Sequence, residues 1–155
     1  MPDAAERVRA CLAAHGVEWH VVALPATVHT ARDMARALGC EAPRIVKSLV
    51  FRGRSSDRPV LVLASGPNRV DEDKLAALVG EIVERADPAY VERRTGFSVG
   101  SVPPVGHLER LATFIDQTLL AHDELWAGTG TPGAVCRLRP ADLVGASGGR
   151  VVPIA

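Results

Sequence analysis

The sequence has few aromatic residues and no long apolar segment. Aromatic residues make up 4% of the 155 positions, so a core would have to be built from small and branched aliphatic side chains. No apolar run approaches the roughly 20 residues that a membrane-spanning helix needs. The first ten residues, MPDAAERVRA, lack the apolar segment of a signal peptide. These absences predict a cytoplasmic protein that makes no contact with a membrane.

An excess of charge of either sign is also missing. The chain has 18 basic and 18 acidic residues, so no overall field draws it to nucleic acid or to an anionic membrane. A local basic patch is compatible with this balance. Four basic residues could contact phosphates, although solvated helix faces would explain them equally well: Arg69, Lys74, Arg93 and Arg94.

The sequence shows no signature of a metal site or of a covalent catalytic mechanism. Its three cysteines, Cys11, Cys40 and Cys136, are scattered and form no CxxC pair, which predicts reduced, mostly buried thiols. The five histidines form neither an HExxH motif nor a Cys/His cluster. A GxSxG elbow and a catalytic-cysteine motif are both missing. We therefore expect no metal, no cofactor and no protein nucleophile.

Apolar periodicity and capping signals predict alternating helices and strands. Helices are expected over 3–16, 30–39, 71–80, 87–94 and 140–147. Strands are expected over 17–24, 44–51, 60–64, 112–116, 124–128 and 134–138, with a last edge strand over 150–154. No repeat or low-complexity linker divides the chain, and 47% hydrophobic residues suit one core. The pattern predicts a single α/β (α+β) domain over residues 1–155, with a mixed, mostly antiparallel sheet.

A glycine-rich run, GTGTPG, spans residues 128–133 and matches GxGxxG literally. A dinucleotide fingerprint needs a helix after the glycines, but here a strand-like segment comes next and Pro132 lies inside the run. A hairpin turn is therefore favoured over a cofactor site. Gly128 and Gly130 could still bring backbone amides close to a ligand.

Lys47 lies in the middle of an apolar strand, RIVKSLVF. Alternation places Lys47 with Ile45 and Leu49 on one face and Ser48 on the other, and both faces are largely apolar. An unpaired buried ammonium is costly, so Lys47 needs a partner or a task. An internal salt bridge, with Asp116 as a candidate, is one explanation, and a ligand in a cleft is the other.

The segment from Thr95 to His107 has three glycines and two prolines in thirteen residues and breaks all periodicity. Glycine at position 100 permits close backbone approach, and Pro103 and Pro104 stiffen the backbone after it. Rigid amides of this kind can stabilise charge on a carbonyl oxygen. An inert surface turn is the alternative.

Asp116 comes directly after a predicted strand, where its side chain can point into a cleft. Its alternative role is to cap the helical segment QTLLAHDEL. His107 and His122 could join a nucleophilic site, but no catalytic motif accompanies them, so exposed polar positions are the favoured explanation.

Taken in order, these motifs resemble the YbaK family of prolyl-tRNA-synthetase-associated editing domains, over about Thr27 to Leu143. The most specific parts are the strand lysine and the Thr-Gly-aromatic-x-x-Gly-x-x-x-Pro segment that begins at Thr95. The resemblance implies a compact domain whose mixed, partly barrel-like sheet is surrounded by helices. It also implies hydrolysis of the ester that joins a wrong amino acid to tRNA.

By resemblance, Lys47 orients the terminal adenosine of the tRNA or the substrate backbone, and the amides around Gly100 hold the aminoacyl carbonyl. Asp116 completes the predicted catalytic set, either in proton transfer or by shaping the pocket. The remaining residues are expected to bind substrate: Thr30, Ser48, Thr95, Gly96, Phe97, Ser101, Val102, Pro103, Pro104, His107, Gly128 and Gly130.

The expected partner is the acceptor end of an aminoacyl-tRNA, preferentially tRNA-Pro, with prolyl-tRNA synthetase as a candidate second partner. Water, or a thiol of the substrate itself, would attack the ester. Cysteine, alanine, serine and threonine all stay open as the misacylated residue, because editing pockets discriminate by size. Two alternatives remain: a noncatalytic module that binds aminoacyl-tRNA, an amino acid analogue or a synthetase, and a hydrolase of another small aminoacyl ester or amide.

Overall fold

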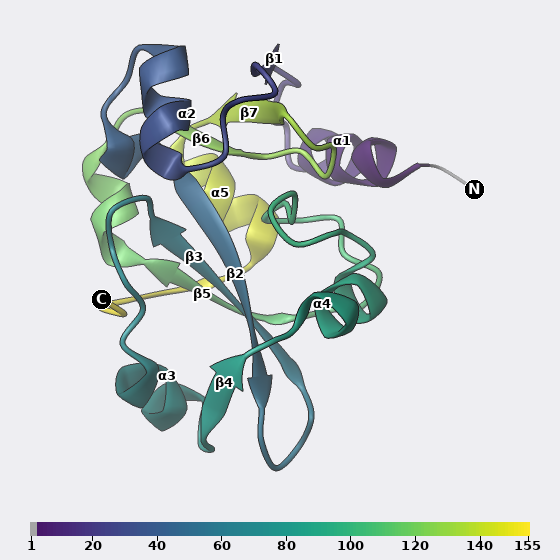
Figure 1. The fold of residues 1–155 in the computed structure, drawn as a ribbon, viewed down its shortest axis with the longest axis vertical. Coiled ribbons are helices and arrows are strands. Elements are labelled where there is room, and N and C mark those ends of the chain that lie inside the picture. Colours follow the sequence, from purple (N-terminus) through teal and green to yellow (C-terminus); the bar gives the residue numbers. More distant parts are fainter. Residues whose placement is uncertain (1–2) are drawn as a thin grey trace.

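A long hairpin, formed by β2 (Val46–Gly53) and β3 (Pro59–Ser65), runs through the centre of the molecule (Figure 1). It is seen in a computed structural model that describes residues 3–155. The two strands are antiparallel, and their register runs from Val46 opposite Ser65 to Arg52 opposite Pro59. Every residue of β3 is buried, as expected for a strand that is apolar on both faces.

The hairpin is the middle of a five-stranded sheet with the order β4-β2-β3-β5-β8. β4 (Val83–Arg85) pairs antiparallel with β2, whereas β5 (Ala112–Asp116) is parallel to β3 and β8 (Arg150–Val152) is parallel to β5. The parallel pairs are made possible by helical crossovers between the strands. The edge position of β8 agrees with the sequence expectation.

A second sheet has the order β1-β7-β6 and is wholly antiparallel. It consists of β1 (Val21–Ala23), β6 (Leu125–Gly128) and β7 (Ala134–Leu138). A single bridge between Ile45 and Trp126 joins it to the start of β2. The two sheets meet at this corner and do not close into a barrel, so the mixed, mostly antiparallel architecture is confirmed and the barrel-like character is limited to that corner.

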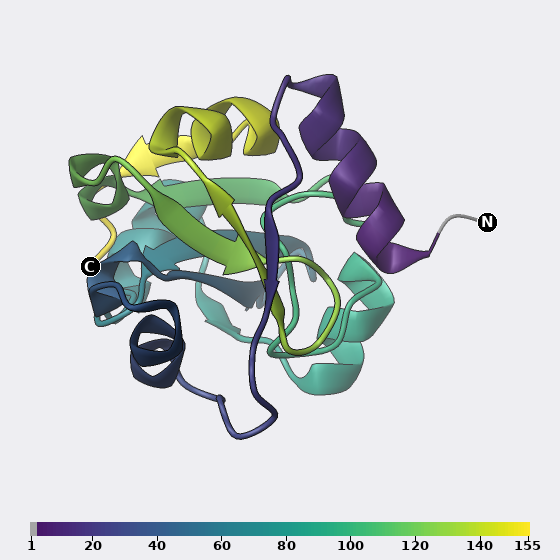
Figure 2. The same cartoon turned by 90° about the horizontal axis from the view of Figure 1, so that it is seen from above.

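Within residues 3–155, five α-helices cover the sheets: α1 (Ala4–Ala14), α2 (Ala31–Leu38), α3 (Glu72–Val79), α4 (Pro88–Thr95) and α5 (Pro140–Ser147). They lie where the sequence predicts them because the caps are local signals. The side chains of Asp3, Thr30, Asp71 and Asp87 accept N–H groups of the first turns. Viewed from above, α1 and α2 lie on opposite sides of the second sheet (Figure 2). No helix within residues 3–155 is both long and apolar enough to cross a bilayer.

The core lies on both faces of the five-stranded sheet. Val46, Val50 and Leu63 face a large cluster that includes Phe97 and Val102, which come from the segment after α4. Phe51, Val62 and the other alternate residues face a second cluster with Leu75 of α3. A third, smaller cluster joins α2 to the second sheet: Ala35, Ile45, Trp126 and Val135. The segment after α4 is therefore part of the core.

Three local expectations need correction. The strand predicted over 17–24 is limited to the three residues of β1. These residues are exposed, because β1 is an edge strand that pairs with β7 alone. β4 was not predicted, since three residues carry too little periodicity. The segment after Asp116 is a short 3-10 helix, Gln117–Ala121, capped by that aspartate. The three cysteines are free, and only Cys136 is fully buried.

Candidate functional site

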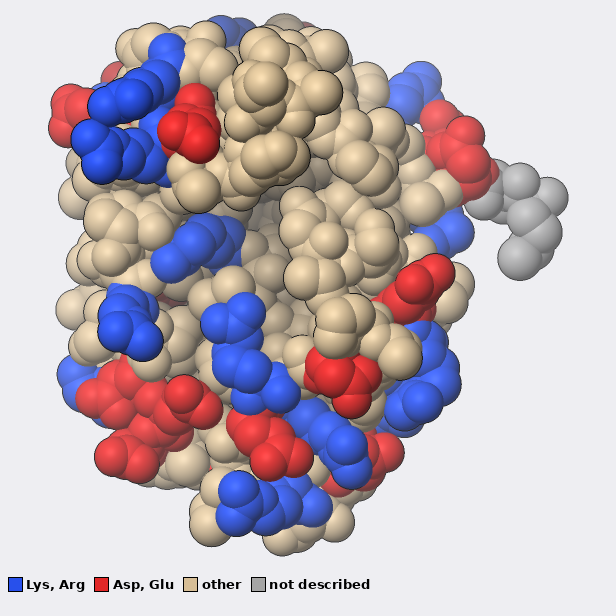
Figure 3. Space-filling view, in the orientation of Figure 1, with Lys and Arg blue, Asp and Glu red and all other residues tan. Residues whose placement is uncertain are grey.

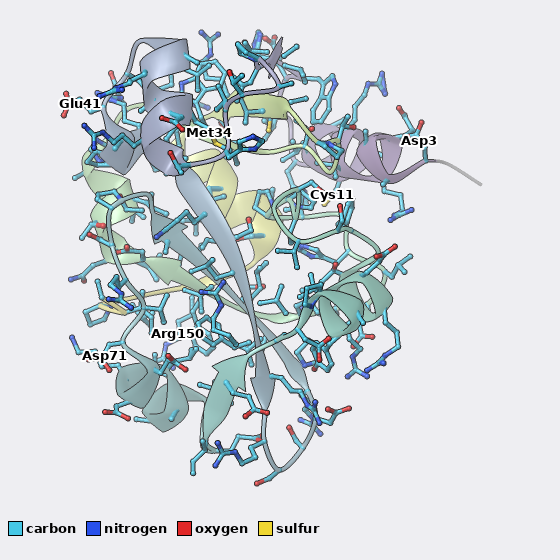
Figure 4. The ribbon with its side chains drawn as sticks, in the orientation of Figure 1. Asp3, Cys11, Met34, Glu41, Asp71 and Arg150 are labelled. Atoms are coloured by element: carbon cyan, nitrogen blue, oxygen red, sulfur yellow. The ribbon has the colours of Figure 1, made fainter. Side chains whose placement is uncertain are left out.

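A cavity of about 520 Å³ lies between β2, the segment after α4 and the second sheet. Ile45 and residues 46–50 of β2 form one wall, residues 98–102 another, and residues 126–128 with 131–135 a third. Met34 of α2, labelled in Figure 4, also lines it. Met34 packs against the cluster that contains Ile45, Trp126 and Val135. The cavity is therefore assembled from segments that are far apart in the sequence.

The charged groups of the cavity are all basic. Lys47 and Arg85 line it, together with the imidazole of His29, and none of the lining residues in the described chain is an aspartate or a glutamate. Figure 3 shows the hollow near the centre of the molecule, with Lys and Arg side chains along its left and lower edges. Such a site suits a ligand with carbonyl or anionic groups and offers no carboxylate as a general base.

Lys47 is half-buried, and its Nζ donates to the backbone carbonyl of Asn68 at 2.7 Å. Burial lowers the pKa of this amine, the nearby charge of Arg85 lowers it further, and Asp116 opposes the shift. Among the ion pairs of residues 3–155, none includes Lys47. The suggested salt bridge with Asp116 is therefore not formed, and Lys47 is held by a neutral carbonyl.

Asp116, at the end of β5, is fully buried and does not line the cavity. Its carboxylate accepts hydrogen bonds from Ser65 N at 3.1 Å, Asn68 Nδ2 at 2.9 Å, Thr118 N at 3.0 Å and Thr118 Oγ1 at 2.8 Å. Burial alone would raise the pKa of this carboxyl, but these donors hold it below its usual value of 3.8. Asp116 thus fixes Asn68, and Asn68 in turn fixes Lys47.

Ser48 lies on the opposite face of β2 from Lys47 and also lines the cavity. Its Oγ is buried and has no hydrogen-bond partner in residues 3–155. A buried hydroxyl without a partner is costly, so a polar group of a ligand would be a favourable occupant of the space beside it.

The segment from Ser98 to Ser101 is a tight turn at the cavity wall. Ser101 N donates to Ser98 O at 3.1 Å, and Ser101 Oγ donates to the same oxygen at 3.0 Å. Gly100 has φ +90°, as the third residue of a type II turn requires. In the described chain, the N–H groups of Gly100 and Val102 donate to no protein acceptor, and both residues line the cavity.

The residues on either side of this turn hold it from behind. Thr95 Oγ1 accepts from Phe97 N at 3.1 Å and donates to Val91 O at 2.7 Å. On the other side, His107 Nε2 donates to Pro103 O at 2.7 Å. Burial lowers the pKa of His107, and its ring lies nearly perpendicular to that of Phe97, with 6.0 Å between the two ring centroids. His107 is therefore half-buried and supports the turn.

The cavity brings together one part of the sequence-predicted site and excludes the other. Six of the predicted residues line it: Lys47, Ser48, Gly100, Ser101, Val102 and Gly128. The others lie outside the lining: Thr30, Thr95, Gly96, Phe97, Pro103, Pro104, His107, Asp116 and Gly130. Among these, Thr30 is exposed and caps α2 by accepting from Asp33 N at 3.0 Å.

The run from Gly128 to Gly133 begins at the last residue of β6 and forms the turn to β7, as expected from the strand that comes after it. Gly130 has φ +89°, and a Cβ there would lie 2.4 Å from Cε1 of Phe97. Gly128 lies close to the backbone oxygen of Val102, and a Cβ added at Gly128 would lie 3.1 Å from that oxygen. These glycines let the hairpin pack tightly on the turn at Gly100. Within residues 3–155, no cluster of three or more His, Cys, Asp or Glu could hold a metal ion.

Sequence reasoning missed three functional candidates. Asn68 lies in a turn without periodicity, Arg85 lies on the unpredicted β4, and Trp126 reads only as a core residue. The one available signal for Asn68 was its position in the loop that follows a buried strand, because such loops commonly carry functional side chains.

Known proteins share both the sequence pattern and the fold of this chain. A family model described as "Aminoacyl-tRNA editing domain" matches residues 25–146. A crystal structure of "a putative trans-editing enzyme for prolyl tRNA synthetase" superposes with a TM-score of 0.90 and 41% identity, over 99% of this chain and 98% of that chain.

Two curated relatives are more distant in sequence. The "Putative Cys-tRNA(Pro)/Cys-tRNA(Cys) deacylase EbsC" of Enterococcus faecalis is 27% identical over 81% of this chain and 76% of its own length. The proline–tRNA ligase of Limosilactobacillus fermentum is 36% identical over 59% of this chain. The match spans 17% of that ligase, so the similarity concerns one part of a much larger protein.

Proposed function

This chain belongs to the aminoacyl-tRNA editing domain family, and we propose that it is a trans-editing deacylase that removes a small, wrong amino acid from tRNA. The observation that carries the proposal is the cavity in which Lys47 and the turn at Gly100 meet without any carboxylate. That arrangement suits an ester whose carbonyl oxygen must be stabilised and whose attacking group is not part of the protein.

In the proposed reaction, the N–H groups of Gly100 and Val102 donate hydrogen bonds to the ester carbonyl oxygen. Water attacks the carbonyl carbon, the C–O bond to the terminal ribose breaks, and the ribose hydroxyl leaves with a proton. The α-amino group of the substrate is suitably placed to accept the proton from water, because it is part of the bound aminoacyl group. For a cysteinyl substrate, its own thiol can attack instead. Orientation and charge stabilisation are sufficient for an activated ester.

Lys47 is assigned an orienting role in this reaction, toward the terminal ribose or its phosphate. Its ammonium is anchored by Asn68 O, and Asn68 is anchored by Asp116. Asp116 therefore acts as a positioning residue for Lys47, and we assign it no proton transfer because it does not reach the cavity.

The proposed substrate is an amino acid with a small side chain on tRNA-Pro. A volume of about 520 Å³ has to accommodate part of the terminal adenosine as well as the aminoacyl group, which leaves little room for a large side chain. The names of two relatives refer to prolyl-tRNA synthetase or to tRNA-Pro, which supports tRNA-Pro as the carrier. We accordingly propose the cytoplasm as its location and prolyl-tRNA synthetase as a partner. Cysteine, alanine, serine and threonine are the residues to test.

The test is a panel of tRNA-Pro charged with each of these four amino acids or with proline, incubated with the purified protein. We expect at least one mischarged species to be cleared well above the buffer rate and prolyl-tRNA to be spared. If none is cleared, the deacylase proposal fails. Tight binding of intact aminoacyl-tRNA without turnover would identify the noncatalytic module instead, and equal turnover without the tRNA portion would identify a general aminoacyl esterase.

Lys47→Met tests the assigned role of the amine, and Lys74→Met is its matched control. Lys74 is an exposed lysine on α3 whose Nζ contacts Ala155 O. We expect Lys47→Met to lower deacylation at least tenfold, because the orienting charge is lost. Its free energy of unfolding should stay within about 1 kcal/mol of wild type, because removing a half-buried charge offsets the lost hydrogen bond. Unchanged deacylation by Lys47→Met, with Lys74→Met also unchanged, would refute the role.

A further inference from the structure

Two cations that line the cavity, and a third whose charge acts on one of them, have no carboxylate partner within residues 3–155. Lys47, Arg69 and Arg85 are missing from the ion pairs found within residues 3–155. Other arginines are paired, such as Arg52 with Asp57 and Arg94 with Glu109. Further basic residues, such as Arg110 and Arg150, are also outside these ion pairs, so what distinguishes the three is their position around Lys47.

Arg85 is held at the cavity by an aromatic ring. It lies on β4 directly opposite Phe51 of β2, and its Cζ is 5.6 Å from the centroid of the Phe51 ring. A guanidinium fixed by cation–π contact keeps its planar set of N–H donors free for an anion. Arg85 lines the cavity, so these donors are next to the ligand space.

Arg69 is anchored through its neighbour in the chain. Asn68 accepts from Lys47 Nζ through its backbone carbonyl, and its side chain donates to Asp116 Oδ2 at 2.9 Å and to Thr118 Oγ1 at 3.0 Å. The backbone at position 69 is thereby fixed beside Lys47, while the side chain of Arg69 is exposed.

The three cations are close enough to repel one another. Burial is the largest cause of the lowered pKa of Lys47. The charge of Arg85 is the second cause, and the charge of Arg69 acts in the same direction. Like charges grouped around Lys47 destabilise the free protein, and a bound anion would relieve that repulsion.

We propose that Arg69 and Arg85 form a phosphate subsite at the mouth of the cavity, beside Lys47, which binds the phosphodiester adjoining the terminal nucleoside of an RNA 3′ end. This inference rests on the proposed function, since it places the nucleic-acid part of the same substrate. The cavity would receive the acyl group, and the two arginines would bind the RNA backbone. A protein with no net charge would thus have a local means of holding RNA.

The subsite differs from the basic residues that the sequence alone suggested. Of those four, only Arg69 belongs to it. Arg94 is paired with Glu109 and Lys74 contacts the carbonyl of Ala155. Arg93 and Arg94 both lie over the ring of Tyr90, which does not line the cavity.

The first experiment measures binding and needs no catalysis. A fluorescent single-stranded RNA ending in CCA is titrated with the wild-type protein, with Arg69→Gln, Arg85→Gln and the double variant, at several salt concentrations. We expect the double variant to bind at least tenfold more weakly. The slope of log K against log salt should fall by about 0.7 for each phosphate contact removed. Arg110→Gln is the control, because Arg110 is exposed and lines a separate hollow.

The second experiment compares two substrates that differ in phosphate. For each variant, kcat/KM is measured on an aminoacyl-tRNA and on the matching aminoacyl-adenosine, which has no phosphodiester. We expect the ratio of the two values to fall at least tenfold in the double variant, mainly through KM for the tRNA. Equal loss on both substrates, or RNA binding that matches wild type, would overturn the subsite. RNA binding that depends on both arginines, in a protein that hydrolyses no ester, would leave the subsite standing and refute the proposed deacylase.

Discussion

At the level of single residues, the site is organised by a chain of hydrogen bonds that begins outside the cavity. Asp116 receives four hydrogen bonds and fixes Asn68, which then positions the ammonium of Lys47. An ionised carboxylate that is buried and fully satisfied is rigid, because every movement would leave a donor without an acceptor. The ammonium of Lys47 thus obtains its position from a carboxylate with which it forms no ion pair.

Asp116→Asn should destabilise the protein in a pH-dependent way. An amide keeps one acceptor oxygen but turns an NH₂ group toward two of the four donors, so we expect a loss of about 2–4 kcal/mol at pH 7 in urea unfolding. Because the folded state holds the pKa of Asp116 below 3.8, the carboxylate contributes stability above that value and loses it as pH falls below it. The difference between wild type and variant should therefore shrink on acidification from pH 5 toward about pH 2.5.

A gap between the two proteins that stays constant over this range would contradict the assignment of Asp116 as an ionised, hydrogen-bonded anchor. Glu92→Gln, an exposed substitution on α4, is the control and should change the free energy of unfolding by less than about 0.5 kcal/mol.

At the level of secondary-structure elements, the turn at Gly100 is held between a helix end, a histidine and the β6–β7 hairpin. Phe97 packs under the turn, and Gly130 of the hairpin lies directly against its ring. A loop built into the core in this way keeps its amides in place without regular secondary structure. The hairpin glycines are therefore packing residues for the turn, and they need not contact a ligand to matter for it.

Gly130→Ala tests this packing, with Gly148→Ala as the control. Both positions have positive φ, +89° and +65°, so both variants carry the same kind of backbone strain of about 1 kcal/mol. Only at Gly130 would the new Cβ meet a ring, at 2.4 Å, whereas nothing lies within 4 Å at Gly148. We expect Gly130→Ala to lower the free energy of unfolding by about 1–3 kcal/mol more than Gly148→Ala does. Gly130→Ala should also lower the rate of deacylation at least tenfold, whereas Gly148→Ala should leave it unchanged.

Equal losses in the two variants, measured by urea unfolding and by deacylation of the same mischarged tRNA, would show that the contact with Phe97 does not hold the turn.

At the level of the whole molecule, the cavity lies where two sheets meet at one corner. β2 forms one wall of the cavity, and Ile45, directly before it, bridges to Trp126 of the second sheet. A ligand in this position contacts both sheets and the turn at once, so its binding energy is shared among elements that otherwise have few direct hydrogen bonds between them. Binding should consequently stabilise these parts together.

Hydrogen exchange with and without a non-hydrolysable ligand checks this expectation. An aminoacyl-adenosine analogue with an amide in place of the ester should slow exchange in residues 46–50, 98–102 and 126–128 together. Helix α3, which does not line the cavity, should not change. At a concentration of about 100 times Kd, the ligand should raise the free energy of unfolding by about 2.7 kcal/mol. Protection confined to one wall would show that the ligand does not bridge the sheets.

The helices, the central hairpin and the family could all be predicted from local sequence. Capping residues such as Asp71 and Asp87 act on N–H groups two or three positions away, so their effect can be read locally. Strand alternation likewise placed Lys47 and Ser48 on opposite faces of β2. The turn at Gly100 was also visible, because a glycine near prolines restricts the backbone wherever it lies.

Which residues meet in the site depends instead on the packing of the whole chain. Lys47 contacts a carbonyl 21 positions away, Asn68 contacts Asp116 48 positions away, and Gly130 fits against Phe97 from a different part of the fold. Such contacts depend on the placement of all the elements between them, and no local pattern encodes them. For that reason the sequence could suggest Asp116 as a direct partner of Lys47, and the fold placed Asn68 between them.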